Sequence, residues 1–97
     1  MRVEWSERAI YHVEKVRQYL TSQKSLHVED VIRRIYKKTE ALELNPYLGA
    51  AVQEYSDNNL RELIEPPFRI LYRVHQDSVE VVAVIHGRQN LPRTPRF

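Results

Sequence analysis

Two residue types are missing or scarce in this 97-residue chain: it has no cysteine and only two glycines. Without cysteine there is no disulfide framework and no thiolate zinc site, and the four histidines are scattered rather than placed at metal-ligand spacing. Two glycines are too few for a glycine-rich phosphate loop or a nucleophile elbow. We therefore expect no metal, no cofactor and none of the standard catalytic motifs.

The chain also lacks long apolar runs and a large net charge. No stretch of about 18 apolar residues is present, and the first residues, MRVEWSERAIYHVEKV, alternate charged and apolar types instead of forming the apolar core of a signal peptide. With a formal charge of only +2, contacts with anions must come from local clusters of basic residues. We expect a single domain, residues 1–97, located in the cytoplasm without membrane contact.

The first half of the chain is predicted to form a short strand and two antiparallel helices. Val3 and Trp5 alternate with charged residues, as in a strand with one buried face. Ser6 is a suitable N-cap, and the helix expected after it carries one apolar stripe formed by Ala9, Val13, Val16 and Leu20. After a polar cluster, a second helical pattern follows with apolar or small residues at Val28, Val31, Ile32, Ile35, Thr39 and Leu42.

The second half is predicted to be an antiparallel meander. Strands are expected at residues 52–55, 60–64, 68–75 and 79–86, with turns between them. In the third of these, Phe68, Ile70, Tyr72 and Val74 share the face that should receive the helices. The last strand is apolar on both faces, which is typical of a central strand. The predicted fold is an α+β domain, β-α-α-β-β-β-β, with two antiparallel helices packed on one face of a twisted, mainly antiparallel sheet.

Three arginines of the predicted sheet are candidate binding residues. Arg69 and Arg73 alternate with the helix-facing residues, so they should lie on the opposite face, and Arg61 joins them if its strand has the expected register. Guanidinium groups on such a surface favour bidentate carboxylate or phosphate partners. The alternative is that each arginine pairs with a glutamate of a neighbouring strand, namely Glu62, Glu65 or Glu80.

The end of the last strand and the tail after it are further candidates. His86 can transfer protons near neutral pH, although a strand-end histidine can equally be a hydrogen-bonded surface residue. The sequence after His86 contains Arg88, Arg93 and Arg96 and no acid. We expect residues 91–97 to form an extended basic tail that lies on nucleic acid or on an acidic partner, or else a frayed end.

Five pieces of sequence follow one another along nearly the whole chain: WS..A, NP..G, LREL, FRILYRV and VAVIHGRQNL. In this order and spacing they resemble the ParE/RelE superfamily of bacterial type II toxin-antitoxin toxins. The resemblance implies the same β-α-α-β-β-β fold and a cognate antitoxin whose disordered C-terminal segment folds onto the toxin. It also makes a toxin dimer within that complex a possible arrangement.

The resemblance implies one of two activities. RelE-like members are ribosome-dependent endoribonucleases that cut mRNA with basic residues on the sheet and an acid or base near the C-terminus, whereas ParE-like members inhibit DNA gyrase. Arg69 matches a basic position shared by both groups. The strand before it carries Leu60 and Glu62 where RelE-like enzymes have lysine or arginine, and no tyrosine follows the last strand. A carboxylate at that place would repel the scissile phosphate.

The resemblance therefore favours a ParE-like toxin that binds gyrase and has no covalent chemistry of its own. Its expected target- or antitoxin-binding residues are Arg61, Arg69, Arg73, His86 and Arg88. The alternative is a RelE-like nuclease with the ribosome and mRNA as partners, in which Arg69 and Arg88 stabilise the phosphate and His86 acts as general acid or base. A third possibility is an inactive homologue that only binds its antitoxin.

Overall fold

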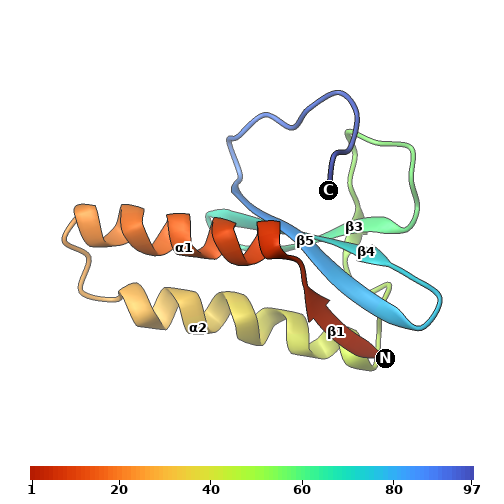
Figure 1. The fold of residues 1–97 in the computed structure, drawn as a ribbon, viewed down its shortest axis with the longest axis horizontal. Helices are drawn as coiled ribbons and strands as arrows, with labels where there is room; N and C mark the ends of the chain where they lie inside the picture. The colour runs from red at the N-terminus through yellow and green to blue at the C-terminus, as the bar shows by residue number, and fades with distance from the viewer.

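The elements follow one another in the order predicted from the sequence. They are β1 (Arg2–Trp5), α1 (Glu7–Ser22), α2 (Val28–Lys38), the 3-10 helix η1 (Thr39–Glu43), β2 (Ala50–Ala51), β3 (Leu60–Glu65), β4 (Phe68–Val74) and β5 (Ser78–His86). The computed structural model describes residues 1–97. Figure 1 shows α1 and α2 side by side along one face of the sheet. The predicted α+β class is thus confirmed.

The five strands form one sheet in the order β1-β5-β4-β3-β2. β1 runs parallel to β5, and all other neighbours are antiparallel. A bulge interrupts the β4–β5 pairing: Leu71 pairs with Ala83, whereas Tyr72 pairs with Val81. Val82 is therefore an extra residue in β5, and the alternation of side chains between the two faces shifts by one position there.

The local sequence explains where the helices begin and what they bury. The Ser6 Oγ accepts a hydrogen bond from the backbone N–H of Ala9 at 3.1 Å, which caps α1. Glutamate and aspartate in the first turn of α2 and lysines in its last turn complement the helix dipole. The linked ends of the two helices project beyond the sheet, so part of their inner face has no strand beneath it (Figure 1). None of the helices has the length and apolar character needed to cross a membrane.

The sheet has an apolar core on each face. On the helix side the core includes the four β4 residues predicted to face the helices: Phe68, Ile70, Tyr72 and Val74. On the far side a smaller core is formed by Val52, Leu60, Leu71, Val82, Ala83 and Ile85. Three partly buried side chains cover this far-side core, namely Tyr55, Leu91 and Phe97. The prediction that the last strand is central and covered on both faces is confirmed.

Two predicted elements differ from the structure by more than one residue at a boundary. The strand predicted at residues 52–55 is instead a two-residue strand at Ala50–Ala51. Val52 turns into the far-side core, and the chain reverses there, with the Tyr55 N–H donating to the Val52 carbonyl at 3.2 Å. The second α-helix ends at Lys38. Thr39 and Leu42, the last residues of its predicted apolar pattern, lie in the more tightly wound 3-10 helix η1.

The C-terminal strap, residues 87–97, returns across the far side of the sheet, away from the helices (Figure 1). Its start is held by a hydrogen bond from the Gly87 N–H to the Pro67 carbonyl at 2.7 Å. Leu91 and Phe97 then pack against the far-side core. The alternative of a frayed end does not hold, because these two apolar side chains pack on sheet residues. That the basic tail lies on nucleic acid or on an acidic partner stays a prediction.

Candidate functional site

Arg69 lies on the far face of the sheet, as predicted, but its guanidinium group is already occupied. It donates to both carboxylate oxygens of Glu54, at 2.8 and 3.0 Å, and its Nε donates to Glu62 at 2.7 Å. The hydrogen bond from Arg69 holds the pKa of the Glu54 carboxyl below its usual value, and the hydrogen bonds to Glu54 and Glu62 raise the pKa of Arg69. Two carboxylates thus neutralise one cation, so Arg69 is paired within the chain.

Arg73 is also on the far face and is also paired within the chain. Its Nη1 donates to the Asp57 carboxylate at 2.7 Å. Asp57 accepts a second hydrogen bond from the Asn59 N–H at 2.9 Å, and these two bonds lower the pKa of Asp57, the backbone bond more strongly. The sequence predicted glutamate partners from neighbouring strands. That alternative holds for Arg69 with Glu62, whereas the partner of Arg73 comes from a turn.

Arg61 does not join the other two arginines. It lies opposite Tyr72, whose side chain belongs to the helix-side core, so Arg61 points to the helix side of the sheet. Its Nε donates to the Gly49 carbonyl at 2.8 Å, and its guanidinium lies 5.3 Å from the centre of the Tyr47 ring. The expected register was wrong because the strand has leucine on both faces, Leu60 and Leu63, which leaves its orientation ambiguous in the sequence.

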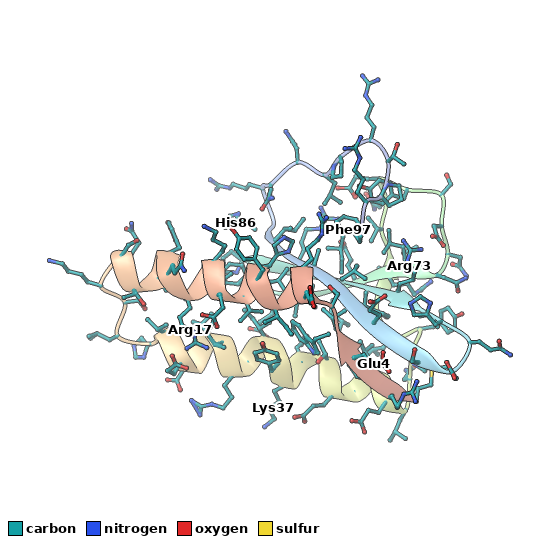
Figure 2. All side chains as sticks on the ribbon, viewed as in Figure 1. Glu4, Arg17, Lys37, Arg73, His86 and Phe97 are labelled. Atoms are coloured by element: carbon teal, nitrogen blue, oxygen red, sulfur yellow. The ribbon has the colours of Figure 1, made fainter.

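His86 and Arg88 are not brought together with Arg69. His86 lies opposite Phe68 in the β4–β5 pairing, and the two rings meet edge to face with centres 6.2 Å apart, so His86 is on the helix side. Its Nδ1 accepts a hydrogen bond from the Arg88 N–H at 3.1 Å. Arg73 and His86 lie far apart in Figure 2. Arg69 and His86, two residues of the nuclease alternative, therefore lie on opposite faces of the sheet.

A groove of about 790 Å³ lies where the projecting helices meet the end of the sheet. We call it the helix–sheet groove. Its apolar lining includes Val16, Leu20, Val31 and Phe68. Its polar lining includes Lys15, Arg34 and His86, and no acidic side chain lines it. The groove therefore combines apolar and positively charged side chains.

His12 lies in this groove and was not identified from the sequence. Its Nδ1 accepts a hydrogen bond from the Val84 N–H at 3.1 Å, on the edge of β5 that β1 no longer covers. Burial, and secondarily the charge of Arg8, lower the pKa of His12. The sequence feature that could have identified His12 is its spacing with Val16 and Tyr19 at i, i+4 and i+7. These three residues line the groove from one side of α1, next to the apolar stripe of that helix.

The far face carries a different arrangement. The Tyr55 hydroxyl donates to the Pro92 carbonyl at 2.6 Å, and its ring meets the Phe97 ring edge to face, with centres 6.3 Å apart. Burial raises the pKa of Tyr55. Figure 2 shows Phe97 above the sheet on the side away from the helices. Tyr55 thus joins the loop after β2 to the C-terminal strap, and together they cover the far-side core.

No group of three or more histidine, aspartate or glutamate side chains is placed to hold a metal ion. The helix–sheet groove combines apolar and basic lining without acids, whereas the hollow beside Arg69 is also lined by Glu54 and Glu62. The arrangement therefore offers recognition surfaces rather than a converged set of reacting groups.

Comparison with known proteins places the chain in a family. A family model described as the ParE toxin of type II toxin-antitoxin systems, parDE, matches residues 3–91. A chain of the chromosomal ParDE TA system from P. aeruginosa has a TM-score of 0.72 at 17% identity, covering 89% of this chain and 95% of that one. YafQ from E. coli strain BL21(DE3) has a TM-score of 0.51 at 14% identity, covering 89% and 93%. None of the curated proteins compared matches the chain.

The two solved structures share the fold, whereas the family model covers nearly all of the sequence. The resemblance read from the sequence motifs is thereby confirmed. The chain belongs to the ParE toxin family of type II toxin-antitoxin systems.

Proposed function

We propose that this ParE-family toxin arrests growth by binding DNA gyrase in the cytoplasm, without covalent chemistry of its own. The observation that carries the proposal is the separation of Arg69 from His86. A ribonuclease needs a cation at the scissile phosphate and an acid or base beside it. Here Arg69 is neutralised by two carboxylates on the far face, and His86 lies on the helix side. This arrangement favours inhibition by binding.

A cognate antitoxin would neutralise the toxin by placing a segment in the helix–sheet groove. The apolar lining suits one face of an amphipathic helix, and the basic lining without acids suits acidic side chains at its edge. Arg69 and Arg73, named above as expected target- or antitoxin-binding residues, are less suited to receive such acids, because both arginines already have carboxylate partners. Lys15, which forms no ion pair, and Arg34, whose contact with the Glu65 carboxylate is long at 3.8 Å, take that role in the proposal.

Charge reversal tests the groove. The variant K15E/R34E should weaken antitoxin binding by at least about tenfold, which corresponds to 1.4 kcal/mol. The matched control is K37E/K38E, which makes the same charge change on α2 outside the groove. Equal weakening by both variants would mean that net charge, and not the groove, governs binding. Titration calorimetry with a peptide of the antitoxin C-terminus gives the affinities.

The target is tested in two parallel reactions with the purified toxin. One contains gyrase and relaxed plasmid, and the other contains translating ribosomes and a defined mRNA. Blocked supercoiling or accumulated cleaved DNA, with intact mRNA, supports the proposal. Codon-positioned mRNA cuts with normal supercoiling would refute it and establish the nuclease alternative. In that case R69A, H86A and R88A would each be expected to lower the cleavage rate.

A further inference from the structure

The C-terminal strap is ordered on the sheet by its apolar side chains. Leu91 and Phe97 pack against the far-side core, and the Pro92 carbonyl accepts the Tyr55 hydroxyl at 2.6 Å. A hydrogen bond from the Gln89 N–H to the His86 carbonyl, 2.9 Å long, shapes the turn by which the strap leaves β5. The side chains between these anchors are therefore held in place and turned outward.

The outward surface of the strap is positive and unneutralised. Its exposed side chains beyond the turn are polar or proline, and they include Arg88, Arg93 and Arg96. None of these three arginines takes part in an ion pair, and residues 87–97 contain no acid. The nearby acids of the loop after β2 are already paired with Arg69 and Arg73. The guanidinium groups of Arg88, Arg93 and Arg96 are thus exposed and have no carboxylate partner within the chain.

The chemistry of this surface fits phosphate better than a protein partner. The core of a protein–protein interface is apolar and depleted of charge, whereas the exposed side chains of the strap are polar or proline. The strap instead presents arginine, glutamine, asparagine and threonine, which are the side chains that contact phosphate and sugar oxygens. Interfaces with nucleic acid are more polar and more positive than those with protein.

The strap also distinguishes between kinds of nucleic acid. Single strands are bound largely by stacking bases on exposed aromatic side chains. Phe97 is the one aromatic residue of the strap, and its ring packs inward against Tyr55. Double-stranded RNA is recognised by its shape over about 16 base pairs and by contacts to 2′-hydroxyls as well as phosphates, so an RNA duplex is compared directly in the test below. We infer that the outer surface of the strap binds the phosphate backbone of duplex DNA without sequence preference, through Arg88, Arg93 and Arg96. This inference is independent of whether gyrase is the target.

The expected binding is weak and strongly dependent on salt. Each neutralised phosphate contributes about −0.9 to the slope of log affinity against log salt, so three contacts give about −2.7. Raising the salt from about 50 to about 200 mM should therefore weaken binding roughly 40-fold. Fluorescence anisotropy of a labelled 20-base-pair duplex (length chosen at roughly two helical turns) measures this with the full-length toxin.

Three variants test the assignment. R88A/R93A/R96A should abolish measurable binding at low salt, and it should fold normally because the three side chains are exposed. R8A/K37A/K38A removes the same charge from the exposed helix surface and should bind like the wild type. L91A/F97A keeps every charge but releases the strap, and it should bind at least about threefold more weakly, because the arginines must then be ordered on binding.

Several results would overturn the inference. Equal losses in the strap and helix triple variants would mean that net charge alone is responsible. Unchanged binding by L91A/F97A, with the fold verified by circular dichroism, would mean that the strap does not present the arginines. Tighter binding of a single-stranded DNA or an RNA duplex of the same length would reject duplex DNA. Equal binding of polyglutamate, with the same dependence on the three arginines, would point instead to an acidic protein segment.

Discussion

Replacing Arg69 by alanine should destabilise the fold before it affects any contact with a target. The side chain of Arg69 is only 13% exposed and that of Glu62 only 16%. Removing the cation leaves the Glu62 carboxylate largely buried without its partner. Breaking a fully buried pair in this way costs about 3–5 kcal/mol. Because Glu54 is more exposed and can regain water, we expect about 2–3 kcal/mol here.

The loss is large for a domain of this size. A change of 1 kcal/mol shifts the melting temperature of a domain of roughly 100 residues by about 4–8 °C, so R69A should melt about 10–20 °C lower. Since total stability is about 5–15 kcal/mol, loss of growth arrest by R69A would not by itself identify a binding residue. The milder variant E54Q leaves Arg69 paired with Glu62 and should cost about 1 kcal/mol or less. Urea unfolding monitored by circular dichroism gives both values.

A neutral replacement of the whole ion-pair network separates a role of Arg69 in stability from a role in contacting the target. The variant R69M/E54Q/E62Q removes all three charges while keeping similar side-chain volumes, and such replacements of ion networks are often neutral for stability. We expect stability and growth arrest to recover together. If R69A unfolds at the wild-type urea concentration but fails to arrest growth, the reasoning is refuted. The same holds if the neutral variant is stable but inactive, because Arg69 would then contact the target.

Three further predictions concern other contacts. Folding lowers the pKa of His12, so neutral His12 contributes fully to stability above the ordinary pKa of 6.5, and this contribution is lost as the pH falls below that value. The unfolding free energy of the wild type relative to H12N should therefore decrease from pH 7.5 to pH 5.5. A Cβ on Gly49 would lie 2.2 Å from the Glu62 carbonyl oxygen, so G49A should cost about 1–3 kcal/mol in urea unfolding, and a cost below about 0.5 would contradict that contact. Truncation after Asn90 removes Phe97 and its neighbours from the far-side core, so the melting temperature should fall by several degrees, whereas a free tail would leave it unchanged.

The parts of the fold that the sequence predicted depend on local periodicity. The strict alternation in Phe68–Val74 fixes which side chains face the helices, and Ser6 specifies where α1 begins. The bulge at Val82 could not be predicted, because every residue around it is apolar. The apolar far face of β5 was predicted to be covered, but the residues that cover it, Leu91 and Phe97, lie in a segment whose arginines suggested a solvated tail.

The candidate site was harder to predict because it depends on tertiary pairing. Arg69 and Arg73 lie on the predicted face, yet their partners Glu54 and Asp57 come from the loop after β2, whose path is set by Val52 in the far-side core. No periodic pattern links a loop carboxylate to a strand arginine. The groove likewise results from helices that extend past the sheet, which is a property of relative lengths rather than of any single motif.

The two proposed binding surfaces lie on opposite sides of the sheet, and this makes their tests independent. The helix–sheet groove is apolar and basic, whereas the strap surface is polar and basic. The two meet at Gln89, which lies at the start of the strap and lines the groove, while Leu91 and Phe97 hold the rest of the strap on the far-side core. Substitutions without shared contacts have nearly additive effects. The groove variant K15E/R34E should therefore bind the antitoxin less well, while its DNA binding still depends on the strap arginines. R93A/R96A, which spares Arg88 between the groove residues His86 and Gln89, should leave antitoxin affinity unchanged. Coupled losses in both assays would mean that one partner spans the two faces, and the division of roles proposed for them would fail.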